Sequence, residues 1–284
     1  MKKNLLKKRR KILLNYVIGP LIFLLLSVSI YYKLKDETSL QEAKDLLTGA
    51  LSGNNILLIL SLLLLMITNW GIEAAKWKIL VSRIQHINYF TCFKAVLSGV
   101  SLSLLLPNGI GDYAGRTVYM NEGNRLRSVT LTLVGSMAQL IITLIAGLFG
   151  LIYLKETSWK NIGELQGLSG YWINVIIFMV AIGSTLMLVI YFKLNWLTLM
   201  FEKIPFVSRY KFMVENLETI ESRVLTRILL LSLIRFTVFI VQYLAVLHIF
   251  NVQLNIVDAT CTVCVMFLVL AILPTIPVAD LGMR

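Results

Sequence analysis

Long apolar runs separated by short polar segments make up most of this 284-residue chain. A helix that crosses the hydrocarbon core of a bilayer needs about 20 predominantly apolar residues. Five runs meet or approach that length: residues 12–32, 56–72, 129–154, 171–192 and 228–250. The pattern predicts an all-α, polytopic helical membrane protein that forms a single transmembrane domain over residues 1–284.

Two shorter apolar runs, residues 89–106 and 259–273, end abruptly in polar segments. The breaks fall at Pro107, Gly109 and Gly111 in the first segment and at Pro274, Pro277 and Gly282 in the second. Proline lacks the N–H that continues a helix, and glycine permits tight turns. Non-helical backbone at membrane depth persists only inside protein or beside water. We therefore predict two re-entrant hairpins, over residues 89–120 and 259–284.

The distribution of lysine and arginine predicts the orientation. If residues 89–120 return to the side from which they enter, the cytoplasmic segments hold 19 basic residues and the outer segments hold 5. This arrangement agrees with the positive-inside rule and places the N-terminus, with its seven basic residues, in the cytoplasm. Leucines and alanines at helical spacing between charges predict an interfacial helix at residues 39–51.

The composition narrows the class of protein. Hydrophobic residues make up 57% and charged residues 15% of the chain, which is too apolar for a soluble domain of this length. Basic loops beside anionic lipid headgroups explain the net charge of +12 better than nucleic acid does. Cys92, Cys261 and Cys264 lie in apolar runs and complete no metal-binding pattern. We therefore expect no cofactor, metal site, catalytic residue or nucleic-acid partner.

The pattern Asp-x-x-x-Arg follows both proline breaks. It comprises Asp112 and Arg116 in the first segment and Asp280 and Arg284 in the second. Residues four apart share a helix face, so each aspartate can pair with its arginine. Two interrupted segments that enter from opposite sides indicate inverted repeats around a central site.

Ionisable residues in predicted membrane segments are expected to face the protein interior. The candidate substrate-binding residues are Lys94, Asp112, Arg116, Arg235, Asp280 and Arg284. Arginine can hold two phosphate oxygens at once, which favours a phosphate-bearing ligand. The alternative is that each aspartate only neutralises its own arginine, and that Arg235 extends to the membrane interface. The spacing of Gly111 and Gly115 predicts close packing of the returning helix against a neighbour.

The second apolar run ends in NWGIEAAKWK, residues 69–78. Tryptophan and lysine together are typical of anchors at the membrane interface. We assign that role to Trp70, Lys76, Trp77 and Lys78. Contact of this segment, which includes Glu73, with a lipid headgroup is the alternative.

Three motifs resemble a known family. LLPNGIGDYAGR, residues 105–116, is similar to the first signature of the lysylphosphatidylglycerol synthase transmembrane-region family of flippase-like domains, and LPTIPVADLGMR, residues 273–284, to the second. IEAAKWKIL, residues 72–80, resembles the end of the family's second helix. Asp112 stands where the family commonly has glutamate, and the helix after the first signature offers only Gln139 in place of charged residues. The family continues past its second signature, so the resemblance implies a chain truncated at its C-terminus.

The resemblance and the buried charges together imply a lipid flippase-like protein that binds and translocates an anionic or phosphate-bearing lipid. The alternative is a membrane-embedded enzyme or accessory subunit in lipid or lipid-linked glycan metabolism. The expected partner is a membrane phospholipid or a lipid-linked substrate, with a homo-oligomer or a partner enzyme left open. The expected location is the bacterial plasma membrane. The family's soluble aminoacyl-transfer domain is absent from the sequence, so lipid aminoacylation is not implied.

Overall fold

A computed structural model describes residues 55–103, 109–159, 168–193, 220–250, 252 and 255–272. The chain divides into two compact units, Met1–Leu57 and Leu58–Arg284, and the described residues other than 55–57 belong to the second. The predicted span 12–32, the interfacial helix 39–51 and the polar end of the second hairpin, 273–284, lie outside the described residues.

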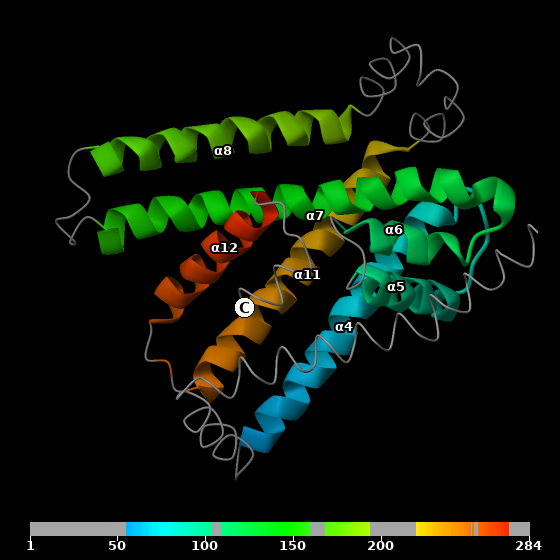
Figure 1. The fold of residues 1–284 in the computed structure, drawn as a ribbon, viewed down its shortest axis with the longest axis horizontal. Helices are drawn as coiled ribbons and strands as arrows, with labels where there is room; N and C mark the ends of the chain where they lie inside the picture. Colours follow the sequence, from blue (N-terminus) through cyan, green and yellow to red (C-terminus); the bar gives the residue numbers. More distant parts are fainter. Residues whose placement is uncertain are drawn as a thin grey trace, which may run out of the picture. The chain divides into compact units, whose positions relative to one another are not determined.

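Every regular element in the described residues is helical, which confirms the all-α prediction (Figure 1). The helices are α4 (Asn55–Val81), α5 (Tyr89–Ser103), α6 (Ile110–Thr117), α7 (Arg125–Leu154), α8 (Leu168–Phe192), α11 (Ser222–Ile249) and α12 (Ile256–Ile272). A 3-10 turn, η3 (Glu122–Asn124), precedes α7, and a π-helical turn, η4 (Lys155–Trp159), follows it.

Four segments of the described chain are long and apolar enough to cross a membrane: Ile56–Val81, Glu122–Thr157, Gly170–Phe192 and Ser222–Ile249. Helix α4 therefore extends nine residues beyond the predicted end at Ile72. The apolar run stops there because Glu73 and Lys76 interrupt it, but the helix continues because both side chains find partners inside the protein. Leu57 and Leu64 of α4 and Phe178 of α8 expose apolar surface, as lipid-facing residues do.

Helix α7 is the centre of the packing, with α6, α8, α11 and α12 against it (Figure 1). Two glycines let α12 approach closely: a side chain at Gly147 would meet Leu268, and one at Gly150 would meet the backbone of Cys261. The main apolar core joins α7 to α4 through buried Trp77, Leu80, Leu131, Val134 and Ala138. Because helices pack against α7 on several sides, polar side chains that it directs toward those helices are held in fixed positions.

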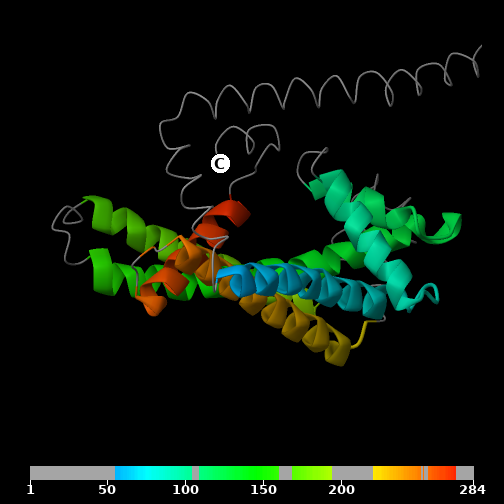
Figure 2. The ribbon, with the colours of Figure 1, turned by 90° about the horizontal axis from the view of Figure 1, so that it is seen from below.

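Helices α5 and α6 form an antiparallel pair, the α5–α6 hairpin, beside one end of α7 (Figure 2). A Cβ atom at Gly115 would collide with the backbone of Gly99, and one at Gly111 with the backbone of Leu102. The two glycines thus make the close approach that their spacing predicts, with α5 as the neighbour. Gly109 begins α6 in the left-handed region with φ 68°, a conformation that favours glycine.

The hairpin helices are short. Helix α5 has 15 residues and α6 has 8, so they extend about 22 Å and about 12 Å at 1.5 Å per residue. Neither reaches the thickness of a hydrocarbon core, about 30 Å. Re-entry of this hairpin into a membrane, and the inverted repeat, stay predictions.

Candidate functional site

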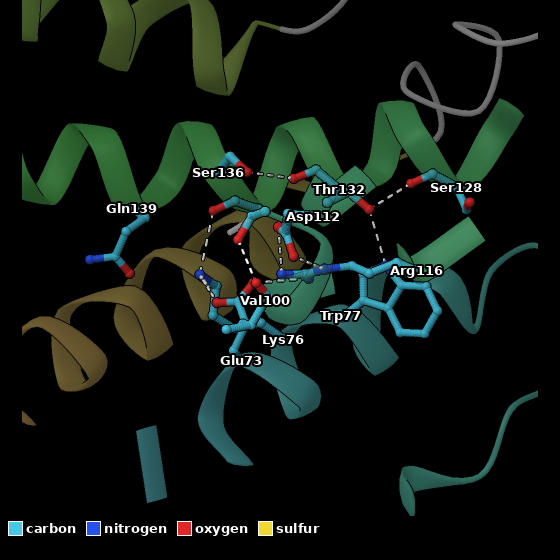
Figure 3. A network of polar contacts seen from close by, with 12 residues as sticks. Glu73, Lys76, Trp77, Val100, Asp112, Arg116, Ser128, Thr132, Ser136 and Gln139 are labelled. Atoms are coloured by element: carbon cyan, nitrogen blue, oxygen red, sulfur yellow. Dashed lines mark hydrogen bonds and ion pairs between the residues drawn. The ribbon is translucent and has the colours of Figure 1, made fainter. Parts of the chain in front are cut away.

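A polar cavity of about 430 Å³ lies among α4, α5, α6, α7, α11 and the end of α12. Its charged lining residues are Glu73, Lys76, Asp112, Arg116 and Arg235. Figure 3 shows four of these side chains converging beside α7, which carries Ser136 and Gln139 on the facing side. The cavity therefore brings together charges from three helices that are far apart in the sequence.

Glu73 is the centre of the charge cluster. Its Oε1 accepts a hydrogen bond from Nη1 of Arg116 at 3.0 Å, and its Oε2 lies 3.1 Å from Nζ of Lys76. The same Oε2 is 3.1 Å from Nη1 of Arg235. Lys76 lies one turn away on the same helix, whereas the arginines come from α6 and α11. One carboxylate thus connects α4 with both other helices.

Arg116 and Asp112 form the pair that their spacing predicts. Nε of Arg116 donates to Oδ1 of Asp112 at 2.9 Å, and Nη2 donates to Oδ2 at 2.8 Å. This two-pronged geometry is the strong form of an arginine–carboxylate contact. The Arg116 side chain is 5% exposed and holds carboxylates of two helices. It therefore fixes α6 against α4.

Arg235 points into the protein and not toward the membrane interface. Besides Glu73, its Nε donates to Oδ1 of Asn69 at 2.9 Å and its Nη1 to Oε1 of Gln139 at 3.4 Å. Its guanidinium also lies 5.2 Å from the ring centroid of Phe239. The alternative that Arg235 extends to the membrane interface is therefore wrong. Its carboxylate partner, Glu73, comes from α4, a helix distant in sequence, so the local pattern around Arg235 could not reveal it. The Arg235 side chain is 19% exposed, more than either other cation of the cluster.

The interfacial role assigned to Lys76 and Trp77 is wrong. Both residues are 1% exposed, on the face of α4 that packs against α7. Nζ of Lys76 donates to the carbonyl oxygen of Gly135 at 3.4 Å, and Nε1 of Trp77 donates to the hydroxyl of Thr132 at 3.1 Å. These partners satisfy the polar atoms inside the protein, so the residues need no contact with headgroups.

The remaining candidates lie apart from this cluster or outside the described residues. Lys94 is exposed on α5 and does not line the cavity. Gly109, the N-cap of α6, lines it at the connected end of the α5–α6 hairpin. Pro107, Pro274, Pro277, Asp280, Gly282 and Arg284 fall outside the described residues. Ala271, near the end of α12, lines the cavity, so the chain leaves the described region at the cavity wall.

Sequence reasoning missed the central position of Glu73 and the part played by Gln139. A signal was present on α4, where Asn69, Glu73 and Lys76 follow the i, i+4, i+7 spacing of one helix face. A similar face of α7 carries polar residues at helical spacing, Thr132, Ser136, Gln139 and Thr143. Two polar faces within apolar helices predict that those helices meet each other, since lipid would leave the polar groups unsatisfied.

The cluster contains three cationic and two anionic side chains. Each cation lies within 3.1 Å of a carboxylate oxygen, so every charged side chain of the cluster is in contact with one of opposite charge. Among the described lining residues the cavity therefore has a surplus of one positive charge. Within the described chain, no group of three or more metal-binding side chains comes together. The arrangement is suited to holding an anion by charge and hydrogen bonds.

Comparison with known proteins agrees with the motifs. The sequence profile of the lysylphosphatidylglycerol synthase TM region matches residues 16–284. No curated protein and no solved structure matches the chain. The match covers nearly the whole chain, including both proline-broken segments and the end of α4 that carries Glu73. The chain is therefore a multi-pass helical membrane protein of the lysylphosphatidylglycerol synthase TM region family.

Proposed function

We propose that this protein is a lipid flippase-like protein that binds an anionic or phosphate-bearing lipid in the polar cavity and translocates it. One observation carries the proposal: a cavity with surplus positive charge lies among helices long and apolar enough to cross a membrane. Buried ionisable residues in such helices are costly in lipid and mark sites of function. The family match is consistent with a lipid substrate.

The residues of the cluster have different roles in this proposal. Arg235 contacts the phosphate, because it combines cavity exposure with a guanidinium that can hold two oxygens. Asp112 and Arg116 hold the α5–α6 hairpin in place. Asp280 and Arg284 contribute to the same site in this proposal on the strength of their sequence motif alone.

Movement of the lipid requires that the cavity open to each side in turn. The two proline-broken segments, as re-entrant hairpins of an inverted repeat, supply that alternation by rocking about the central site. Labelling with an impermeant thiol reagent tests the hairpin, in a variant without native cysteines and with the N-terminus in the cytoplasm. A cysteine at Asn121 should be protected in intact cells and one at Asn161 labelled; labelling at Asn121 would contradict re-entry.

Translocation is tested in proteoliposomes that carry a fluorescent phosphatidylglycerol and are quenched from outside with dithionite. Wild-type protein should let the reagent quench label from both leaflets. Arg235→Gln should slow this quenching by about tenfold or more, equivalent to about 1.4 kcal/mol in the activation free energy of translocation. The matched control is Arg227→Gln, which removes the same charge from an exposed position of the same helix and should behave as wild type. Quenching of the outer leaflet alone with wild-type protein would favour the alternative of an enzyme or accessory subunit.

A further inference from the structure

The charge balance of the cavity identifies the kind of headgroup that fits it. We propose that the cavity accepts one phosphodiester group with a single negative charge, and that Arg235 is the cation that contacts it. This inference rests on the proposed function, because it takes the ligand to be a lipid. It adds the net charge of the headgroup that the cavity prefers and the reason why Arg235 can select for that charge.

The valence follows from the side chains that line the cavity. Lys76, Arg116 and Arg235 oppose Glu73 and Asp112, which leaves one positive charge without a counter-ion among the described residues. An uncompensated charge away from water is costly. A monoanion removes that surplus, a dianion replaces it with a negative surplus, and a zwitterion brings no net charge. A phosphodiester is a monoanion, whereas a phosphomonoester is mainly dianionic above its second pKa of about 6.

Arg235 is the cation that remains available. Arg116 and Lys76 have side chains that are 5% and 1% exposed, whereas that of Arg235 is 19% exposed. Its Nε and Nη1 already donate to partners on α4 and α7. Its Nη2 donates to no residue in the described part of the chain. Arg235 is therefore oriented by its neighbours and still has a terminal nitrogen to offer to a ligand.

The neutral side chains nearby suit a phosphodiester. Gln139 accepts from Arg235 through Oε1, so its amide N–H groups can donate to a ligand oxygen. Ser136, one turn before it on the same wall of the cavity, already donates its hydroxyl to the carbonyl oxygen of Thr132. Gln139 thus adds hydrogen bonds without adding charge, which preserves the preference for a single negative charge.

The test is a competition for binding. Detergent-purified full-length protein is incubated with equal amounts of phosphatidylglycerol, phosphatidic acid and phosphatidylcholine, well above the second phosphate pKa of about 6. Native mass spectrometry then measures the lipid retained. Wild-type protein should retain phosphatidylglycerol, the diester whose headgroup has a net charge of −1, about tenfold over each of the other two, which is about 1.4 kcal/mol.

Variants that change the surplus should change the preferred lipid. Gln139→Glu places a carboxylate of nearly the same shape beside Arg235 and brings the surplus to zero, so the preference for phosphatidylglycerol should be lost. Arg235→Gln should have the same result. Asp112→Asn raises the surplus by one charge and should shift retention toward phosphatidic acid. Arg227→Gln, exposed on α11, is the control and should keep the wild-type preference. Gln139→Glu adds an ion pair, so it keeps the test valid if another variant fails to fold.

The outcomes separate this inference from the proposed function. Equal retention of the three lipids by wild type would overturn the inference alone. An unchanged preference for phosphatidylglycerol in both Gln139→Glu and Arg235→Gln would do the same. Retention of no lipid would overturn the proposed function with it. Soluble glycerophosphoglycerol serves as a competitor without acyl chains. It should displace little phosphatidylglycerol, and complete displacement at equal concentration would overturn a lipid as the source of the phosphodiester.

Discussion

Arg116 and Arg235 bind the same carboxylate, one at each oxygen of Glu73, at 3.0 Å and 3.1 Å. Their remaining partners differ in charge. Arg116 has a second carboxylate on its own helix, Asp112, in two-pronged contact. Arg235 has amide oxygens instead, from Asn69 and Gln139. A carboxylate both orients and neutralises a guanidinium, whereas an amide orients it and leaves its charge in place.

The two sides of the cavity are thus built for different tasks. On the hairpin side, glycine-lined packing and a neutralised arginine favour a fixed geometry. On the α11 side, a more exposed arginine shares Glu73 with Lys76 and has only neutral partners besides, so part of its charge stays unbalanced toward the cavity. The difference predicts that changes on the hairpin side mainly affect folding, and changes on the α11 side mainly affect the ligand.

Glu73→Gln, which removes the carboxylate common to both sides, should have the largest effect on stability. It leaves Lys76 and Arg235 in the cavity without a described carboxylate partner. Breaking a buried ion pair from one side costs about 3–5 kcal/mol in soluble proteins. Thermal unfolding in detergent measures the change, with exposed Glu122→Gln as the control. A midpoint like that of the control would show that the cluster contributes little to the fold.

Asp112→Ala should follow, with a loss of about 3 kcal/mol, since Arg116 stays buried and loses both prongs of its pair. The same thermal assay measures it. The double variant Asp112→Ala/Arg116→Gln should recover part of that loss, because it also removes the positive charge that Asp112 balanced. Equal stability of the single and double variants would place Asp112 outside the scaffold and weaken the contrast between the two arginines.

Gly115→Ala tests the packing of the hairpin without altering charge. Its added methyl group would meet the backbone of Gly99, which cannot move aside as a flexible side chain would. Overpacking of this kind costs about 1–3 kcal/mol. The control is Gly123→Ala, where the added atom has no neighbour within 4 Å. If both variants unfold at the temperature of the wild type, the close contact of α5 and α6 is not required.

Asn69→Ala should have the smallest effect on stability, about 1 kcal/mol for one lost hydrogen bond to Arg235. The amide Nδ2 of Asn69 has no partner in the described structure, so removing it leaves no donor unpaired. Lipid retention should change more than stability does, because Arg235 loses an orienting contact. A stability loss as large as that of Asp112→Ala would show that the α11 side is scaffold too.

Much of the fold could be predicted from local patterns. Apolar runs locate the described membrane helices, and the glycine spacing anticipates the close contact within the α5–α6 hairpin. The end of α4 could not be found in that way. A criterion based on apolar runs stops before Glu73, whereas the real helix continues to Val81 because α6, α7 and α11 supply partners for its polar face.

The site was predictable only in part, for a related reason. The pairing of Asp112 with Arg116 lies within one helix, so spacing alone predicts it. The contacts of Glu73 with Arg116 and Arg235 depend on how three helices cross, which no local pattern contains. Polar residues at helical spacing on α4 and α7 would have identified the faces that meet. They would not have shown which arginine has positive charge left unbalanced by carboxylates.

The pairing of Glu73 with Lys76 bears on how the protein is made. Arg116 follows Glu73 by 43 positions and Arg235 comes later still, so Glu73 and Lys76 are synthesised before either arginine. During that interval Lys76, one turn away, is the counter-ion that α4 carries with it. A helix with a neutral internal pair enters a bilayer at lower cost than one with a lone carboxylate. Lys76 is thus the first residue able to neutralise Glu73 during biosynthesis, before Arg116 and Arg235 are made.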